Sequence, residues 1–127
     1  LVTIASNTQV QSNKNLPGPF QKASSLGSGW QYLSWFGYFA SLGDPSMPWI
    51  YRTDLGWLYV AAGSSETGFW LWCDTLSSWL WSSQSIAGSG YYYKWSDEDW
   101  IFMLPNPDGN GAWILSTKTG EWSSVGL

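Results

Sequence analysis

The sequence predicts an all-β fold of tandem antiparallel β-hairpin repeats, each 21–22 residues long. One series of tryptophans recurs with gaps of 22, 22, 21 and 22 residues, at Trp35, Trp57, Trp79, Trp100 and Trp122. A second aromatic series runs in step with it, with gaps of 21, 22 and 21 residues, at Trp49, Trp70, Tyr92 and Trp113. Aromatic and β-branched residues with turn formers between them favour strands, and we find no helical periodicity of useful length. Two series in phase indicate about five copies of one small unit.

The N-terminal part of the chain differs from the rest. Residues 1–28 contain a single aromatic residue, Phe20, among Ser, Asn, Gln, Gly and Pro. Residues 1–5 can pair as an edge strand, whereas residues 11–18 have the composition of a polar linker. We therefore expect an extended arm and linker over residues 1–28, followed by an aromatic hairpin domain over residues 29–127. The apolar residues of the arm are candidates for a contact with another subunit, and they are Leu1, Val2 and Ile4.

The hairpins follow in order from residue 29, each with an aromatic strand, a polar turn and a second aromatic strand. The predicted pairs are residues 49–51 with 57–59, 70–72 with 79–81, 91–95 with 100–102, and 113–115 with 122. Residues 30–39 are dense in aromatic side chains, and the hairpin pattern does not decide their form. Such hairpins can stack as a solenoid, close into a barrel or pack as two sheets, and the sequence does not choose between these arrangements.

Each predicted hairpin has two chemically different faces, because side chains alternate across a strand. Trp57 and Tyr59 point to one side and Leu58 to the other. The same alternation separates Trp79 and Trp81 from Leu80, and Trp100 and Phe102 from Ile101. A buried aromatic ring removes roughly 150–250 Å² from water, and short hairpins cannot enclose all 24 aromatic residues. Some rings must therefore line a surface, a groove or a subunit contact.

Composition and charge disfavour several classes of function. The net charge is −4 and the five cations are scattered, which argues against nucleic acid and against docking to an anionic membrane. No apolar run approaches the ~20 residues of a transmembrane segment. The single cysteine, Cys73, excludes an intrachain disulfide, and we expect it to be a small buried hydrophobe. Because the chain starts at Leu1 without an initiator Met, we expect a mature product or an excised piece of a longer protein, and in particular a secreted protein whose signal has been removed.

Catalysis, metal binding and cofactors are not expected. The chain has no His, which is the usual general base and the commonest metal ligand. Paired carboxylates hydrolyse glycosides, but most acidic residues here stand in predicted turns. Asn106, Asp108 and Asn110 have the spacing with which calcium loops begin, yet Thr117 occupies the twelfth place, which requires a bidentate acid. An ordinary turn is the better interpretation.

A resemblance to known repeats rests on Gly56-Trp57-Leu58-Tyr59 and its recurrences at residues 78–81 and 99–102. This unit resembles the hairpin repeats of bacterial choline-binding and glucan-binding cell-wall modules, and the aromatic-repeat domains of secreted bacterial proteins. The resemblance implies a non-catalytic, surface-associated module whose rings hold choline or sugar. The period and loops are longer here, and Gly precedes Trp only at Trp30 and Trp57, so choline specificity does not carry over.

Two functions remain open. The leading hypothesis is an extracellular or cell-surface module that binds polysaccharide or cell-envelope glycan through an aromatic platform, formed by Trp57, Tyr59, Trp79, Trp81, Trp100 and Phe102. The alternative is a structural subunit that binds copies of itself and builds a filament or surface layer. In that case the N-terminal arm or an apolar sheet face adds to a neighbouring subunit.

Overall fold

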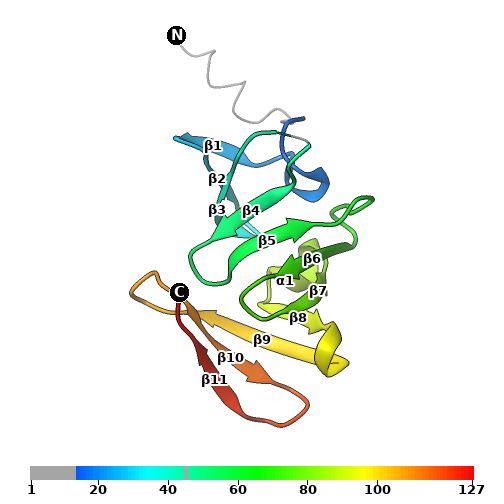
Figure 1. Ribbon diagram of the computed structural model, residues 1–127, viewed down its shortest axis with the longest axis vertical. Coiled ribbons are helices and arrows are strands. Elements are labelled where there is room, and N and C mark those ends of the chain that lie inside the picture. Colours follow the sequence, from blue (N-terminus) through cyan, green and yellow to red (C-terminus); the bar gives the residue numbers. More distant parts are fainter. Residues whose placement is uncertain (1–13, 45) are drawn as a thin grey trace.

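The computed structural model describes residues 14–44 and 46–127 as one antiparallel sheet of eleven strands in sequential order (Figure 1). The strands are β1 (Ser24–Gly27), β2 (Trp30–Leu33), β3 (Gly37–Ser41), β4 (Trp49–Arg52), β5 (Gly56–Val60), β6 (Phe69–Cys73), β7 (Ser78–Ser82), β8 (Tyr91–Lys94), β9 (Asp99–Pro105), β10 (Ala112–Ser116) and β11 (Trp122–Val125). The helical segments are η2 (Gly18–Phe20), α1 (Gln84–Ala87) and η3 (Trp95–Asp97). The predicted contact residues Leu1, Val2 and Ile4 lie outside the described residues.

The predicted all-β fold of tandem hairpins is confirmed. Trp49 pairs with Tyr59, Trp70 with Trp81, Tyr93 with Trp100, and Leu115 with Trp122, as the four predicted hairpins require. The undecided residues 30–39 form one further hairpin, in which Trp30 pairs with Ala40. Successive hairpins also pair with one another, so the repeats extend one continuous sheet. That sheet is open, because β1 and β11 stand at its two ends and do not pair.

The open sheet is coiled, so that segments far apart in sequence come together. The Gly111 amide donates to the Thr53 carbonyl at 2.8 Å, which ties the β9–β10 loop to the β4–β5 turn. The side chain of Leu127 lies beside Gly56, and the C-terminus reaches the β5 region in Figure 1. The right-handed twist of strands accumulates over many strands in this way. The coil creates an enclosed inner face without closing a barrel.

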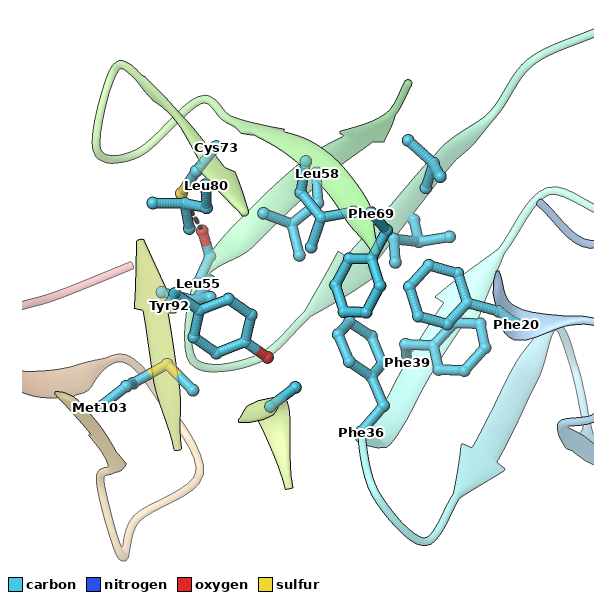
Figure 2. Packing of buried hydrophobic residues seen from close by; sticks show 14 of the residues in the cluster. Phe20, Phe36, Phe39, Leu55, Leu58, Phe69, Cys73, Leu80, Tyr92 and Met103 are labelled. Atoms are coloured by element: carbon cyan, nitrogen blue, oxygen red, sulfur yellow. Dashed lines mark hydrogen bonds between the residues drawn. The ribbon is translucent and has the colours of Figure 1, made fainter. Parts of the chain in front are cut away.

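The aliphatic side chains of the strands fill this inner face. The buried ones at the strand centres are Ile50, Leu58, Leu71, Leu80, Ile101 and Ile114. Near the N-terminal end, four phenylalanines group together, as Figure 2 shows for Phe20, Phe36, Phe39 and Phe69. Cys73 is buried in the same core, as expected, and donates from Sγ to the Leu55 carbonyl at 3.7 Å. Burial raises the pKa of the Cys73 thiol, so this thiol is an inert core group at neutral pH.

Part of the N-terminal segment belongs to the core. Phe20, at the end of η2, has no exposed surface, and its ring centroid lies 4.4 Å from that of Phe36. Leu16 is also buried, and β1 pairs with β2 through Ser24 and Tyr32. The structure thus places residues 16–27 in the folded unit, ahead of the boundary at residue 29 that composition indicated. Phe20 anchors this segment together with the buried side chains of Leu16, Pro19 and Ala23.

A buried ion pair joins the β4–β5 hairpin to β8. Arg52 donates from Nε and Nη2 to the two carboxylate oxygens of Asp54, at 3.0 and 2.7 Å. Its Nη1 donates to Tyr92 Oη at 3.0 Å, and its guanidinium lies 4.4 Å from the ring centroid of Phe36. Burial opposes the charged form of Arg52, but Tyr92 and Asp54 outweigh burial and raise the pKa of Arg52. Burial also raises the pKa of Tyr92, which keeps its hydroxyl neutral.

Candidate functional site

Most tryptophan and tyrosine side chains of the strands lie on the side of the sheet that faces away from the core, which we call the outer face. Along β5, Leu58 is fully buried whereas Trp57 is 45% exposed. The same alternation of buried and partly exposed residues recurs along β4, β6 and β7. The sequence left two possibilities, either two buried faces or one buried face and one apolar exposed face. The structure has the second arrangement.

Rings on the outer face pack edge to face across neighbouring strands. The ring centroids lie 5.3 Å apart for Trp49 and Tyr59, 5.7 Å for Trp72 and Trp79, and 5.6 Å for Tyr93 and Trp100. Such pairs contribute roughly 0.5–1.5 kcal/mol each beyond the area that they bury. The rings therefore stabilise the hairpins while their faces and edges stay accessible to solvent.

Three grooves open on this face, each bounded by two rings of one hairpin. The first groove has a volume of about 340 Å³ and is lined by Leu42, Trp49, Trp57 and Asp74. The second has about 300 Å³ and is lined by Ala61, Trp70, Trp79 and Trp95. The third has about 640 Å³ and is lined by Ser85, Ile86, Ser89, Tyr91, Trp100 and Thr117.

The three grooves occupy equivalent positions in successive repeats. Their first rings, at positions 49, 70 and 91, and their second rings, at 57, 79 and 100, recur with the period of the sequence. A third wall comes each time from the turn of the following hairpin, at positions 74, 95 and 117. Backbone hydrogen bonds hold this wall, because Asp74 N donates to Trp57 O at 3.3 Å and Thr117 N to Trp100 O at 3.1 Å. One repeat thus completes the groove of the repeat before it.

The six predicted platform residues divide into two groups. Trp57, Trp79 and Trp100 line one groove each. The other three lie on the outer face but outside these three linings, and each packs against a groove ring: Tyr59 on Trp49, Trp81 on Trp100, and Phe102 on Tyr91. The structure therefore brings three of the six into grooves and places the other three beside them.

Sequence reasoning missed the first ring of each groove, at positions 49, 70 and 91, although the second aromatic series contained a signal for it. Trp49 and Trp70 belong to that series, but its third member, Tyr92, is only 1% exposed and points inward. Tyr91 takes the outer position instead, because a shift of one residue along a strand moves a side chain to the other face. Trp35 also departs from its series, since it lies in the β2–β3 turn and stacks on Phe20.

The acidic residues of the loops take part in local structure. Asp108 accepts a hydrogen bond from the Asn110 amide at 2.9 Å, and Asn106 Nδ2 donates to the Asn110 carbonyl at 2.9 Å. These contacts describe a tight turn. Hydrogen bonds from the backbone and side chain of Ser46 lower the pKa of Asp44. Within residues 14–44 and 46–127, no three His, Cys, Asp or Glu side chains are grouped as metal ligands.

The fold and the outer face together define a class of protein: a coiled, open all-β sheet that presents ring-lined grooves at equivalent positions in three successive repeats. No protein-family model, curated protein or solved structure matches the chain. Among the described residues, no helix has the length and apolar character needed to cross a membrane.

Proposed function

We propose that this protein is a non-catalytic, extracellular or cell-surface module that binds polysaccharide or cell-envelope glycan in the grooves of its outer face. The observation that carries the proposal is the recurrence of one groove design three times, with exposed rings in equivalent positions. Ligand sites are concave, mostly apolar and furnished with a few polar groups. Flat aromatic rings match this need for sugars, whose C–H faces are apolar and whose edges carry hydroxyl groups.

Polar groups stand at the rims of two grooves. The Asp74 carboxylate borders the first groove and accepts hydrogen bonds, whereas Ser85, Ser89 and Thr117 border the third with hydroxyl groups that donate and accept. The second groove is formed by three tryptophans and Ala61. Rings that only hold hairpins together would stabilise the fold most if their surface were buried. Trp57 and Trp95, however, are 45% and 59% exposed. This exposure favours a role in binding in addition to cross-strand packing.

We expect Trp79→Ala to weaken glycan binding about tenfold or more, because truncating an aromatic anchor in a binding pocket costs over 1 kcal/mol. The measurement is isothermal titration calorimetry with a panel of laminarin, dextran, amylose, xylan and solubilised peptidoglycan, supported by tryptophan fluorescence. Tyr38→Ala is the matched control, since Tyr38 is 63% exposed on the outer face of β3 and lines none of the three grooves. The intact chain showing neither heat nor fluorescence change with any member of the panel would contradict the proposal.

A self-assembling subunit remains the second candidate, and the sheet edges favour it. Within residues 14–44 and 46–127, both β1 and β11 leave one side of the strand unpaired, and neither contains a charged residue or a proline, the usual protections against edge pairing. This candidate predicts that the intact chain forms large assemblies, which multi-angle light scattering detects. Placing a lysine at Ser124, on β11, should then return monomers. Monomers of the intact chain at all concentrations would exclude this role.

A further inference from the structure

The three grooves form a staggered row across the sheet, and the register of the strands defines it. Trp49 pairs with Tyr59, Tyr59 with Trp72, and Trp72 with Trp79, so a ring of the first groove and a ring of the second share one cross-strand row. The next row runs from Trp70 through Trp81 and Tyr93 to Trp100, and links the second groove to the third. Each groove is therefore displaced from the one before by two strands and by two residues along the strand.

This displacement sets the distance that a ligand must span. Strands lie about 4.8 Å apart and rise about 3.3 Å per residue, so neighbouring grooves are separated by roughly 12 Å along an oblique path. One sugar ring is too short to bridge that distance, whereas a chain of a few linked sugars reaches it. Ring contacts continue between the grooves, since Trp81 packs on Trp100 with centroids 6.2 Å apart. The path from one groove to the next is thus apolar and ring-lined.

The twist of the sheet restricts the form of the ligand further. Adjacent strands rotate by roughly 20–25°, so each groove is turned by about 45° relative to the previous one. A flat crystalline surface cannot lie against three grooves that face in different directions. A single chain with rotatable linkages can follow them.

We infer that the ligand is one soluble, flexible polysaccharide chain that occupies all three grooves at once. This inference rests on the proposed function and specifies its substrate class: a single polymer strand, as opposed to a monosaccharide or a crystalline polysaccharide. Binding at the first groove holds the rest of the chain near the second and third, which raises its effective concentration there. Three individually weak grooves then give one strong site.

The test uses size-fractionated oligosaccharides of two to twelve units from laminarin, dextran and peptidoglycan glycan strands, titrated by calorimetry. In the series that binds, we expect the affinity to rise at least a hundredfold from the shortest to the longest oligomer. The stoichiometry should fall from three short oligomers per protein to one long oligomer. Crystalline cellulose and chitin should retain little protein in pull-down.

Variants that lack one groove tryptophan distinguish a single chain that spans all three grooves from independent binding at each groove. Trp57→Ala, Trp79→Ala and Trp100→Ala should each remove most of the length-dependent gain, while the affinity per remaining groove for the shortest oligomer stays unchanged. Equal affinity for short and long oligomers, a constant stoichiometry, or strong retention on the crystalline surfaces would overturn the inference and leave the proposed function standing. Absence of binding to every fraction and to the parent polysaccharides would overturn both.

Discussion

Phe20→Ala should lower the free energy of unfolding by about 3–5 kcal/mol, the range for truncating a large ring in a packed core. The ring of Phe20 is fully buried, and its centroid lies within 4.4–5.9 Å of those of Phe36, Phe39, Phe69 and Trp35. It reaches this position from η2, outside the strands, and fills the open end of the coil beside β3 and β6. Its removal leaves a cavity that the surrounding rings cannot fill without losing their own contacts.

Urea denaturation followed by circular dichroism measures this loss. The matched control is Phe102→Ala, in which the same side chain is removed from the half-exposed outer face of β9. That change should cost clearly less, because part of the ring already contacts water. A loss for Phe20→Ala that is no larger than the loss for Phe102→Ala would contradict the expectation that the buried ring of Phe20 contributes more to stability than a half-exposed one.

Asp54→Ala should destabilise the fold by a similar amount, about 3–5 kcal/mol, because it leaves the buried charge of Arg52 without its partner. The side chains of Arg52 and Asp54 retain only 8% and 6% of their exposure. Tyr92 and the ring of Phe36 remain in contact with the guanidinium, but neither carries a compensating negative charge. The cost therefore arises chiefly from a desolvated cation.

Two further variants distinguish this cause from simple loss of contacts. Asp97→Ala breaks the partly exposed Lys94–Asp97 pair, whose atoms lie 3.4 Å apart, and should cost less than about 1 kcal/mol. The triple change Arg52→Met, Asp54→Leu and Tyr92→Phe removes every charge and hydroxyl of the cluster together. It should be more stable than Asp54→Ala, because apolar groups of similar size replace buried ion pairs at little cost. A triple variant less stable than Asp54→Ala would refute the desolvation argument.

Much of the fold could be predicted because it follows from local periodicity. Alternation with a period of two placed Trp57 and Leu58 on opposite faces, and the structure separates them in the same way. Where neighbouring residues are of the same type, the alternation does not show which of them points to the core. Tyr91, Tyr92 and Tyr93 cannot be told apart by residue type. The register with β9 places Tyr92 opposite the buried Ile101, and there its hydroxyl accepts a hydrogen bond from Arg52.

The candidate site could be predicted only in part for a related reason. All first and second rings of the grooves except Tyr91 were visible in the two aromatic series, but the third wall was not. Asp74, Trp95 and Thr117 have different chemistry and share only their place in the turn of the following hairpin. Their role appears once strand register shows which turn lies beside which ring.

By itself, the sequence determined the strands from residue 49 onward, the pairing within four of the hairpins, and the separation of an aromatic from an aliphatic face. These features depend on neighbours within about ten residues, where backbone geometry and turn chemistry act directly. The tertiary structure alone decided that the sheet stays open and coils, that Phe20 fills its end, and that Arg52 joins Asp54 to Tyr92. Those outcomes depend on small twists that add up over eleven strands and on contacts between residues far apart in the chain, such as Gly111 and Thr53, which are 58 positions apart.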